Sequence, residues 1–258
     1  LQRFHAGWLA CVLVGSSLVG SIWVSETTLM TAWYAASSLT LGIASTVLAL
    51  LAIRVFLWWR YKPVRLPTQT VLPSLTVVIP AFNEGAGVHA SIVSVLRSNY
   101  PAEKLRLVVV DDGSTDDTWS HIQKAIGPFA NRVTTVQFKE NRGKRHALYE
   151  GFSRADSEVV ATLDSDSSLQ RDSLEHLVAP LVLDPRVAAV AGKVLVQNRH
   201  RTLITRMLGV RYILGFDFVR AYQSRLRTVW CCPGALQAYR RDAIVPELES
   251  WRDQHFLG

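Results

Sequence analysis

Asp164, Ser165 and Asp166 end an apolar run that begins at Glu158, and their spacing is the strongest chemical signal in the chain. If Val159 to Leu163 form a strand, side chains alternate between its faces, so the two carboxylates point to one side and Ser165 to the other. Carboxylates about 6.6 Å apart repel each other by roughly 2.5 kcal/mol at an effective dielectric constant near 20. A divalent cation held by oxygen ligands would offset this repulsion. A solvated acidic turn is the alternative for such a triplet in isolation.

Two further polar segments follow apolar runs earlier in the chain. Residues 80–84 follow the run 75–79, and residues 111–114 follow the run 105–110. Because loops that follow parallel strands meet at one edge of an α/β sheet, we expect both segments to lie beside residues 164–166. Acidic groups gathered there repel each other, so the pattern predicts a cation and a ligand that donates hydrogen bonds.

A basic pair opens a predicted helix between the third and fourth strands. Lys144 and Arg145 follow Gly143, and cations at a helix N-terminus oppose the helix dipole. Their position therefore indicates an anion-binding site. Two solvated cations are the alternative.

Apolar runs of strand length alternate with helical periodicity from residue 75 to residue 163, which predicts a doubly wound α/β domain. A capping box of Ser114 and Asp117 is expected to start the second helix. The predicted strands are 75–80, 105–110, 133–138, 159–163 and 187–191, and the predicted helices start near Val88, Ser114, Arg145 and Ser173. A long amphipathic stretch with several arginines follows at 202–224.

The composition changes sharply before residue 60. Residues 6–25 and 27–53 contain no Asp, Glu, Lys or Arg. Twenty helical residues span about 30 Å, the hydrocarbon thickness of a bilayer, so transmembrane helices are expected at about 6–25 and 39–59. A secretory signal is the weaker alternative for the first, because its apolar stretch is long and a second one follows. Basic residues cluster at 54–65 while the link between the helices carries only Glu26, which predicts a cytoplasmic domain after residue 60.

Several other classes of function fit the sequence poorly. The net charge of +7 suits anionic lipids or an anionic substrate, and no basic-aromatic motif for nucleic acid is present. Cys231 and Cys232 are adjacent and lack zinc-site spacing, and no disulfide is expected. Residues 85–90 match a dinucleotide fingerprint, but four residues separate the glycines from the strand and spoil the phosphate turn.

Four motifs in this order resemble those of family 2 glycosyltransferases, which have a GT-A fold. They are Val-Val-Ile-Pro-Ala-Phe-Asn-Glu84, Val-Val-Asp-Asp-Gly-Ser114, Gly-Lys-Arg-His-Ala-Leu148 and Leu-Asp-Ser-Asp166. Val210-Arg-Tyr, Arg220-Ala-Tyr-Gln-Ser and the segment Cys231 to Arg241 are similar to those of hyaluronan synthases and rhizobial chitin-oligosaccharide synthases. The resemblance covers about residues 74–258, after two membrane helices in 1–60 and a linker at 61–73. It implies a Rossmann-like, mostly parallel sheet in a cytosolic domain.

The resemblance also implies site residues. Donor binding would involve Ala81, Glu84, Asp111, Asp112, Lys144 and Asp164, with Glu84 and Asp112 at the uridine. Asp164 and Asp166 would serve ribose, diphosphate and Mn²⁺ or Mg²⁺, with Asp166 as the direct metal ligand. Cys232, Gly234 and Ala235 would border the acceptor sugar, although Pro233-Gly-Ala departs from the Ser/Cys-Gly-Pro of relatives.

The activity implied by this resemblance is that of an inverting, processive glycosyltransferase in the plasma membrane, multi-pass, with a cytoplasmic catalytic domain. It would transfer GlcNAc from UDP-GlcNAc to a nascent β-linked polysaccharide, with UDP-GlcA as an open second donor. A chitin-type synthase that uses UDP-GlcNAc alone, a lipid-linked sugar transferase and a catalytically silent UDP-sugar-binding membrane protein are the alternatives. The family's general base is expected in a GDDR or GEDR motif after Gly258, so none is assigned within 1–258. We therefore expect the chain, which starts at Leu1, to be a fragment.

Overall fold

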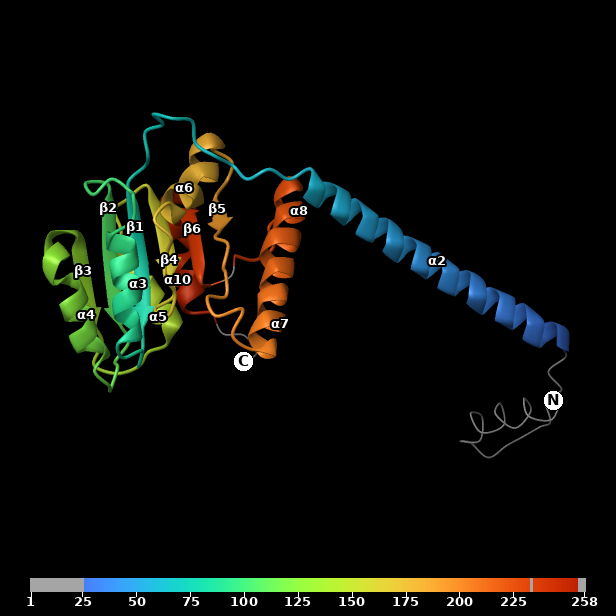
Figure 1. Ribbon diagram of the computed structural model, residues 1–258, viewed down its shortest axis with the longest axis horizontal. Coiled ribbons are helices and arrows are strands. Elements are labelled where there is room, and N and C mark those ends of the chain that lie inside the picture. The colour runs from blue at the N-terminus through green and yellow to red at the C-terminus, as the bar shows by residue number, and fades with distance from the viewer. Residues whose placement is uncertain (1–25, 233, 255–258) are drawn as a thin grey trace. The chain divides into compact units, whose positions relative to one another are not determined.

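The computed structural model describes residues 26–232 and 234–254 (Figure 1). The chain divides into two units, one that ends at Arg54 and one that begins at Val55. A stretch without helix or strand separates Trp59 from Leu75, where the linker was predicted.

The N-terminal described element is α2 (Glu26–Trp59), a helix of 34 residues. At 1.5 Å per residue it is about 51 Å long. Its segment Met30–Trp59 is long and apolar enough to cross a membrane, and within the described part of the chain no other helix meets that test. The predicted link at 26–38 is helical and continues directly into the predicted helix at 39–59. The other predicted membrane segment, 6–25, lies outside the described residues.

Six strands form one sheet in the order β3-β2-β1-β4-β6-β5 (Figure 1). They are β1 (Leu75–Ala81), β2 (Leu105–Asp111), β3 (Val133–Gln137), β4 (Val159–Leu163), β5 (Ala189–Ala191) and β6 (Leu236–Arg240). The first four are parallel, whereas β6 runs antiparallel to both of its neighbours, β4 and β5. This mixed, mostly parallel sheet confirms the predicted α/β class. The strand β6 was not predicted.

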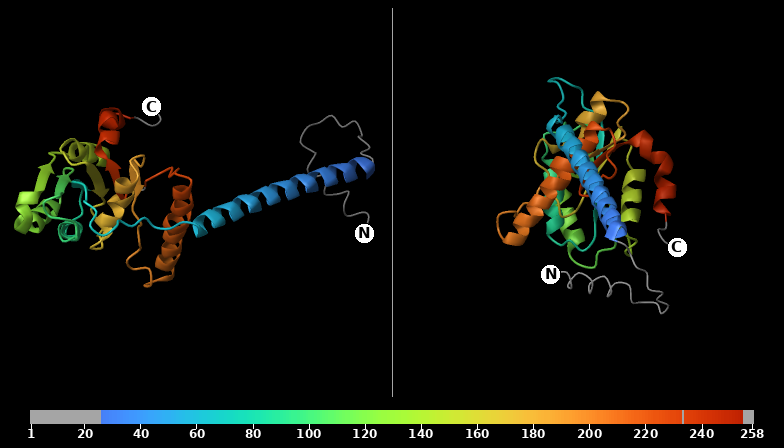
Figure 2. Two further views of the ribbon diagram at one scale, coloured as in Figure 1. Left: turned by 90° about the horizontal axis from the view of Figure 1, so that it is seen from above. Right: turned by 90° about the vertical axis from the view of Figure 1, so that its right-hand side faces the viewer.

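Helices cover both faces of this sheet. One face carries α3 (Gly87–Leu96), α4 (Thr118–Ile126) and α6 (Ser173–Leu183), and the other carries α5 (Lys144–Ser153), α9 (Arg241–Ile244) and α10 (Leu248–Arg252). Two further helices, α7 (Leu203–Tyr212) and α8 (Arg220–Arg225), lie between β5 and β6 in the chain. Short 3₁₀ turns occupy Gly127–Arg132 and Val245–Glu247, and a π-helical segment, Ile213–Val219, joins α7 to α8 into the single long helix seen in Figure 2. The amphipathic stretch predicted at 202–224 is therefore helical.

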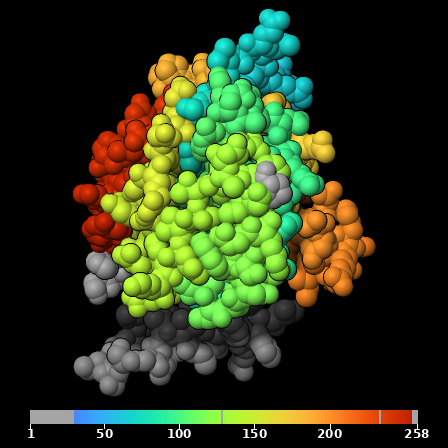
Figure 3. Space-filling model, turned by 90° about the vertical axis from the view of Figure 1, so that its left-hand side faces the viewer, coloured from blue at the N-terminus to red at the C-terminus, as the bar shows by residue number. Residues whose placement is uncertain are grey.

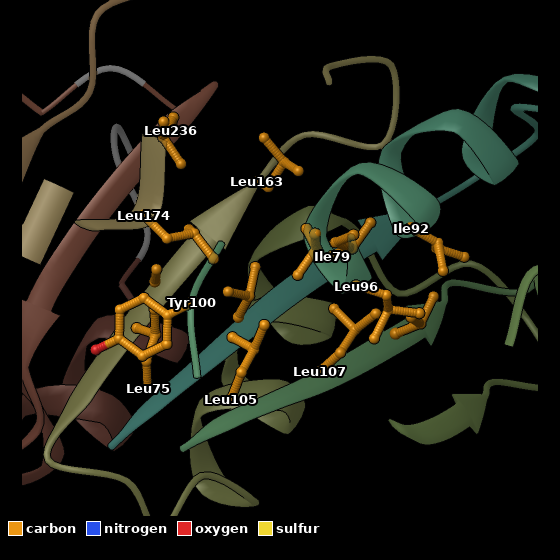
Figure 4. Close-up of a cluster of buried hydrophobic side chains, with 14 of the residues drawn as sticks. Leu75, Ile79, Ile92, Leu96, Tyr100, Leu105, Leu107, Leu163, Leu174 and Leu236 are labelled. Atoms are coloured by element: carbon orange, nitrogen blue, oxygen red, sulfur yellow. The ribbon is translucent and has the colours of Figure 1, made fainter. Parts of the chain in front are cut away.

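Two apolar clusters hold the sheet between its helices. On one face, Leu75, Ile79 and Leu107 of the strands point toward α3 and toward Leu174 of α6 (Figure 4). On the other face, Val78 packs with residues of α5 and α10. Every residue of β1 is buried, and strands covered on both faces read as continuous apolar runs in the sequence. The face at the β3 end of the sheet is made by α4 and the segment that follows it (Figure 3).

The helix α5 approaches β1 very closely at Gly151. A Cβ atom at this position would lie 2.2 Å from Cγ1 of Val78, which is fully buried. Since interiors are close-packed, neither element has free space into which it could move. This contact sets the position of α5, and α5 carries Lys144 at its first turn.

We predict that Gly151→Ala lowers the free energy of unfolding by about 1–3 kcal/mol, because the added methyl group overpacks the Val78 contact. Alanine's better helix propensity, worth up to about 1 kcal/mol, offsets only part of this loss. Denaturant unfolding of the purified chain, followed by tryptophan fluorescence, measures the change. Gly87→Ala is the matched control because no atom lies within 4 Å of its Cβ position. Equal stabilities for the two variants would contradict the close approach.

Candidate active site

A cavity of about 300 Å³ lies at the carboxyl ends of β1, β2 and β4. It forms there because these strands are parallel, so the loops that follow them meet at one edge. Its lining residues are Pro80, Ala81, Phe82, Glu84, Asp112, Asn141, Lys144, Asp164, Ser165 and Asp166. The structure thus brings together the three loops that the sequence placed at one sheet edge, and it adds Asn141 from the segment after β3.

An ion pair crosses the cavity between two predicted site residues. Nζ of Lys144, the first residue of α5, lies 2.5 Å from Oδ1 of Asp164, and these side chains are 53% and 25% exposed. Such exposed pairs contribute only about 0–1 kcal/mol to stability. Lys144 can therefore exchange its carboxylate partner for an anionic ligand at little cost to the fold.

The two aspartates after β2 have different positions. Asp111 is fully buried, and its carboxylate accepts hydrogen bonds from the Ser114 amide at 3.1 Å and from Nε2 of Gln137 at 3.2 Å. It does not line the cavity. Asp112 does, and its Oδ1 accepts from the Arg142 amide at 2.8 Å. Of this predicted pair, Asp111 stabilises the turn and Asp112 faces the ligand space.

Gly113 brings the segment after β3 against the loop after β2. Its φ is +72°, in the left-handed region, and a Cβ atom would lie 2.3 Å from the carbonyl carbon of Glu140. This close approach places Asn141 in the cavity wall. Asn141 was not predicted as a site residue because no local motif marks it. The sequence feature that could have pointed to it is Gly113, the turn glycine against which its segment packs.

The loop after β1 is tied to the loop after β2 by hydrogen bonds. The Asn83 amide donates to Oγ of Ser114 at 3.0 Å, and Oδ1 of Asn83 accepts from the Thr115 amide at 2.9 Å. Asp117 occupies the N-cap of α4 without a side-chain capping bond, so the predicted capping box of Ser114 and Asp117 was wrong. Ser114 serves the neighbouring loop instead.

The glycine-rich stretch after β1 is no phosphate loop. The Gly85 amide already donates to Oδ2 of Asp116 at 3.1 Å and to Oγ1 of Thr118 at 2.8 Å. The pKa of Asp116 is lowered chiefly by the hydrogen bond from the Thr118 hydroxyl, and the bond from the Gly85 amide contributes. The amide that would have to face a phosphate is thus occupied by the chain itself.

The segment before β6 borders the ion pair. The Asp164 amide donates to the carbonyl of Ala235 at 3.1 Å, and a Cβ atom on Gly234 would lie 3.6 Å from Nζ of Lys144. Two of the predicted acceptor-side residues therefore lie beside the predicted donor-side pair.

Burial, with a smaller contribution from Cys231, raises the pKa of the Cys232 thiol, which keeps it protonated at neutral pH.

Asp164 and Asp166 are the candidate cation ligands in the cavity. Within the described ranges, no three His, Cys, Asp or Glu side chains gather as a metal cluster. Asp164 is paired with Lys144, and Oδ1 of Asp166 accepts from Oγ of its neighbour Ser167 at 3.2 Å. Carboxylate oxygens suit hard divalent cations, whose remaining coordination positions would be filled by ligand oxygens and water.

Known proteins resemble this chain over the region that contains the cavity. Residues 76–245 match the family described as Glycosyl transferase family 2. A hyaluronan synthase of Streptococcus pyogenes is 33% identical over 225 residues, which cover 85% of this chain and 52% of that protein. An N-acetylglucosaminyltransferase of Azorhizobium caulinodans is 33% identical over 186 residues, 72% of this chain and 47% of that protein. The chain thus spans about half the length of these relatives.

A solved structure also resembles this chain. The mannosyltransferase PcManGT from Pyrobaculum calidifontis, in complex with GDP-Man and Mn²⁺, superposes with a TM-score of 0.58 at 28% identity and covers 78% of this chain and 56% of that chain. This likeness agrees with a GT-A-like α/β fold around the mostly parallel sheet. The family match includes every loop of the cavity. As its motifs predicted, the chain belongs to glycosyl transferase family 2.

Proposed function

We propose that this chain is the donor-binding part of a membrane-bound, inverting, processive glycosyltransferase that moves GlcNAc from UDP-GlcNAc to a growing β-linked polysaccharide. The observation that carries the proposal is the cavity that places Lys144 beside Asp164 and Asp166. Relatives named hyaluronan synthase and N-acetylglucosaminyltransferase favour this donor and product.

The charges of the cavity suit a nucleoside diphosphate. Lys144 would leave Asp164 and bind the diphosphate, because a doubly charged ligand attracts an ammonium group more strongly than one carboxylate does. Glu84 and Asp112, which come from β1 and β2, would accept hydrogen bonds from the N–H and hydroxyl groups of the uridine. A ligand without N–H or hydroxyl donors at this end would not make these hydrogen bonds.

A divalent cation fits the proposed donor. PcManGT holds Mn²⁺ together with its nucleotide sugar. In this chain, the carboxylate oxygens of Asp166 and Asp164 would bind such a cation. When bound, such a cation would act as a Lewis acid that neutralises the departing diphosphate. Asp166 would hold it directly, while Asp164 would also serve the ribose.

Transfer further requires that the acceptor hydroxyl loses its proton as it attacks the anomeric carbon. Attack opposite the diphosphate converts a UDP-α-sugar into a β-linkage. Gly234 and Ala235 would border the acceptor, since they lie beside the Lys144–Asp164 pair. We expect the general base in a motif after Gly258, so the described cavity would bind the donor and that motif would activate the acceptor.

Two helices support the membrane-bound part of the proposal. The first is α2, whose segment Met30–Trp59 is long and apolar enough to span a bilayer. The second is α7, where Leu203, Ile204 and Met207 are 72%, 71% and 65% exposed. Arginines are interspersed along α7, and a helix with an apolar face and basic flanks suits a membrane surface.

Asp166→Asn should abolish the Mn²⁺-dependent part of UDP binding, because an amide cannot supply the charge that holds the cation. Calorimetric titration of UDP with and without Mn²⁺ measures this difference. Asp156→Asn is the matched control, since Asp156 is an exposed aspartate before β4, at the opposite edge of the sheet. Unchanged Mn²⁺-dependent binding in Asp166→Asn would refute the cation assignment.

Lys144→Met should weaken UDP binding by about 10- to 100-fold. This change corresponds to the loss of a hydrogen bond to a charged group, which contributes about 1.5–3 kcal/mol. Its thermal stability should stay close to that of the wild type, because the ion pair with Asp164 is exposed. Lys139→Met removes an exposed lysine outside the cavity lining and serves as the control. Equal UDP affinities for the two variants would remove Lys144 from the donor site.

The full-length protein, incubated with each labelled UDP-sugar singly and together, should incorporate GlcNAc into polymer. Product formed only with both UDP-GlcNAc and UDP-GlcA identifies a hyaluronan-type chain, and product from UDP-GlcNAc alone identifies a chitin-type chain. Digestion of the polymer with linkage-specific hydrolases reads out the β-linkage. Failure to incorporate GlcNAc under either condition would contradict the proposed donor.

A further inference from the structure

Ser165 lies between the two aspartates of the motif after β4, yet its side chain bonds to a different loop of the cavity. Its Oγ donates to Oε1 of Glu84 at 2.9 Å, and the residue is only 7% exposed. The hydroxyl therefore joins the loop after β4 to the loop after β1, across 81 residues of sequence. Glu84 and Ser165 both line the cavity.

Two serines of α3 hold the loop that carries Ser165. Oγ of Ser91, which is 1% exposed, donates to the carbonyl of Ser165 at 2.5 Å. Oγ of Ser94 donates to the carbonyl of Ser91 at 2.7 Å and accepts from the Leu169 amide at 3.0 Å. The loop is thus fixed to α3 at both ends, so Ser165 presents its hydroxyl to Glu84 from a rigid position.

Glu84 is held at its backbone as well. Its amide donates to Oγ1 of Thr118 at 2.9 Å. The backbone bond leaves the rotatable bonds of the side chain free, and the hydrogen bond from Ser165 restrains them. A carboxylate fixed before the ligand arrives loses less conformational entropy on binding than a mobile one.

We propose that Ser165 is a positioning residue that holds the Glu84 carboxylate in its ligand-binding orientation, with Ser91 and Ser94 as its support. The inference rests on the proposed function, because it requires a nucleoside diphosphate in the cavity. It assigns a different set of residues to each end of the cavity. Ser165 serves the nucleoside end through Glu84, whereas Lys144 and Asp166 serve the diphosphate.

This division predicts a selective defect. Ser165→Ala should weaken binding of UDP by up to about tenfold, because the Glu84 side chain is then mobile and must lose its rotational freedom when the ligand binds. Binding of inorganic pyrophosphate with Mn²⁺ should stay within about twofold of the wild type, because Lys144 and Asp166 are intact. A variant that simply distorted the cavity would lose both ligands together.

Calorimetry of both ligands on the full chain tests the inference. Ser157→Ala is the matched control, because Ser157 is also a buried serine with a side-chain hydrogen bond, 2.6 Å to Oγ1 of Thr76, but outside the cavity lining. It should leave both affinities unchanged. Ser165→Cys, which keeps the volume and weakens the donor, should reproduce the UDP defect and serves if Ser165→Ala fails to fold.

A double-mutant cycle with Glu84→Ala completes the test. If Ser165 acts through Glu84, Ser165→Ala should have no further effect on UDP affinity in the Glu84→Ala background. Additive losses would overturn the inference, and so would a Ser165→Ala variant that binds UDP like the wild type or loses pyrophosphate equally. Wild-type chain that binds no UDP at all would instead overturn the proposed function, together with the inference that rests on it.

Discussion

Carboxylates that gather at one edge of a sheet repel each other, and the loops of this domain must hold them there. Four of them are partnered by hydrogen-bond donors or a cation from another loop, a neighbouring strand or the first turn of α5. Asp111 accepts from Gln137, Asp112 from the Arg142 amide, Asp164 from Lys144 and Glu84 from Ser165. Asp166 accepts from its neighbour Ser167 among the described residues. Its carboxylate is exposed and so stays open to a cation, the role that the family resemblance implies for it.

The fold serves this constraint by bringing separate segments very close together. Parallel pairing of β1 with β2 and β4 sets the three loops side by side. The missing side chain of Gly113 lets the backbone of Glu140 pack against it, which brings Asn141 to the cavity wall. The missing side chain of Gly151 lets Val78 pack against α5, which brings Lys144 there. The site depends on these two glycines as much as on its charged residues.

Much of this architecture could be predicted from the sequence because its signals are local. Three largely buried parallel strands, β1, β2 and β4, read as apolar runs. Loops that follow parallel strands meet at one edge of the sheet, so the three loops could be expected to lie together. By contrast, β6 was missed because Gln237, Tyr239 and Arg240 break any apolar run, and the strand is defined by pairing with β4 and β5. The contact between Ser165 and Glu84 joins residues far apart in sequence, so no local pattern reports it. Asp111 and Asp112 are adjacent acids, and only the folded loop decides which one faces the cavity.

The central claim is that a nucleoside diphosphate and a divalent cation share this cavity. Crystals of the chain grown with UDP and Mn²⁺, measured at the manganese absorption edge, test it most directly. We expect one anomalous peak within bonding distance of an Asp166 oxygen, with the diphosphate beside Nζ of Lys144 and the uridine toward Glu84 and Asp112. A manganese peak away from Asp166, or UDP bound outside the cavity, would contradict the claim.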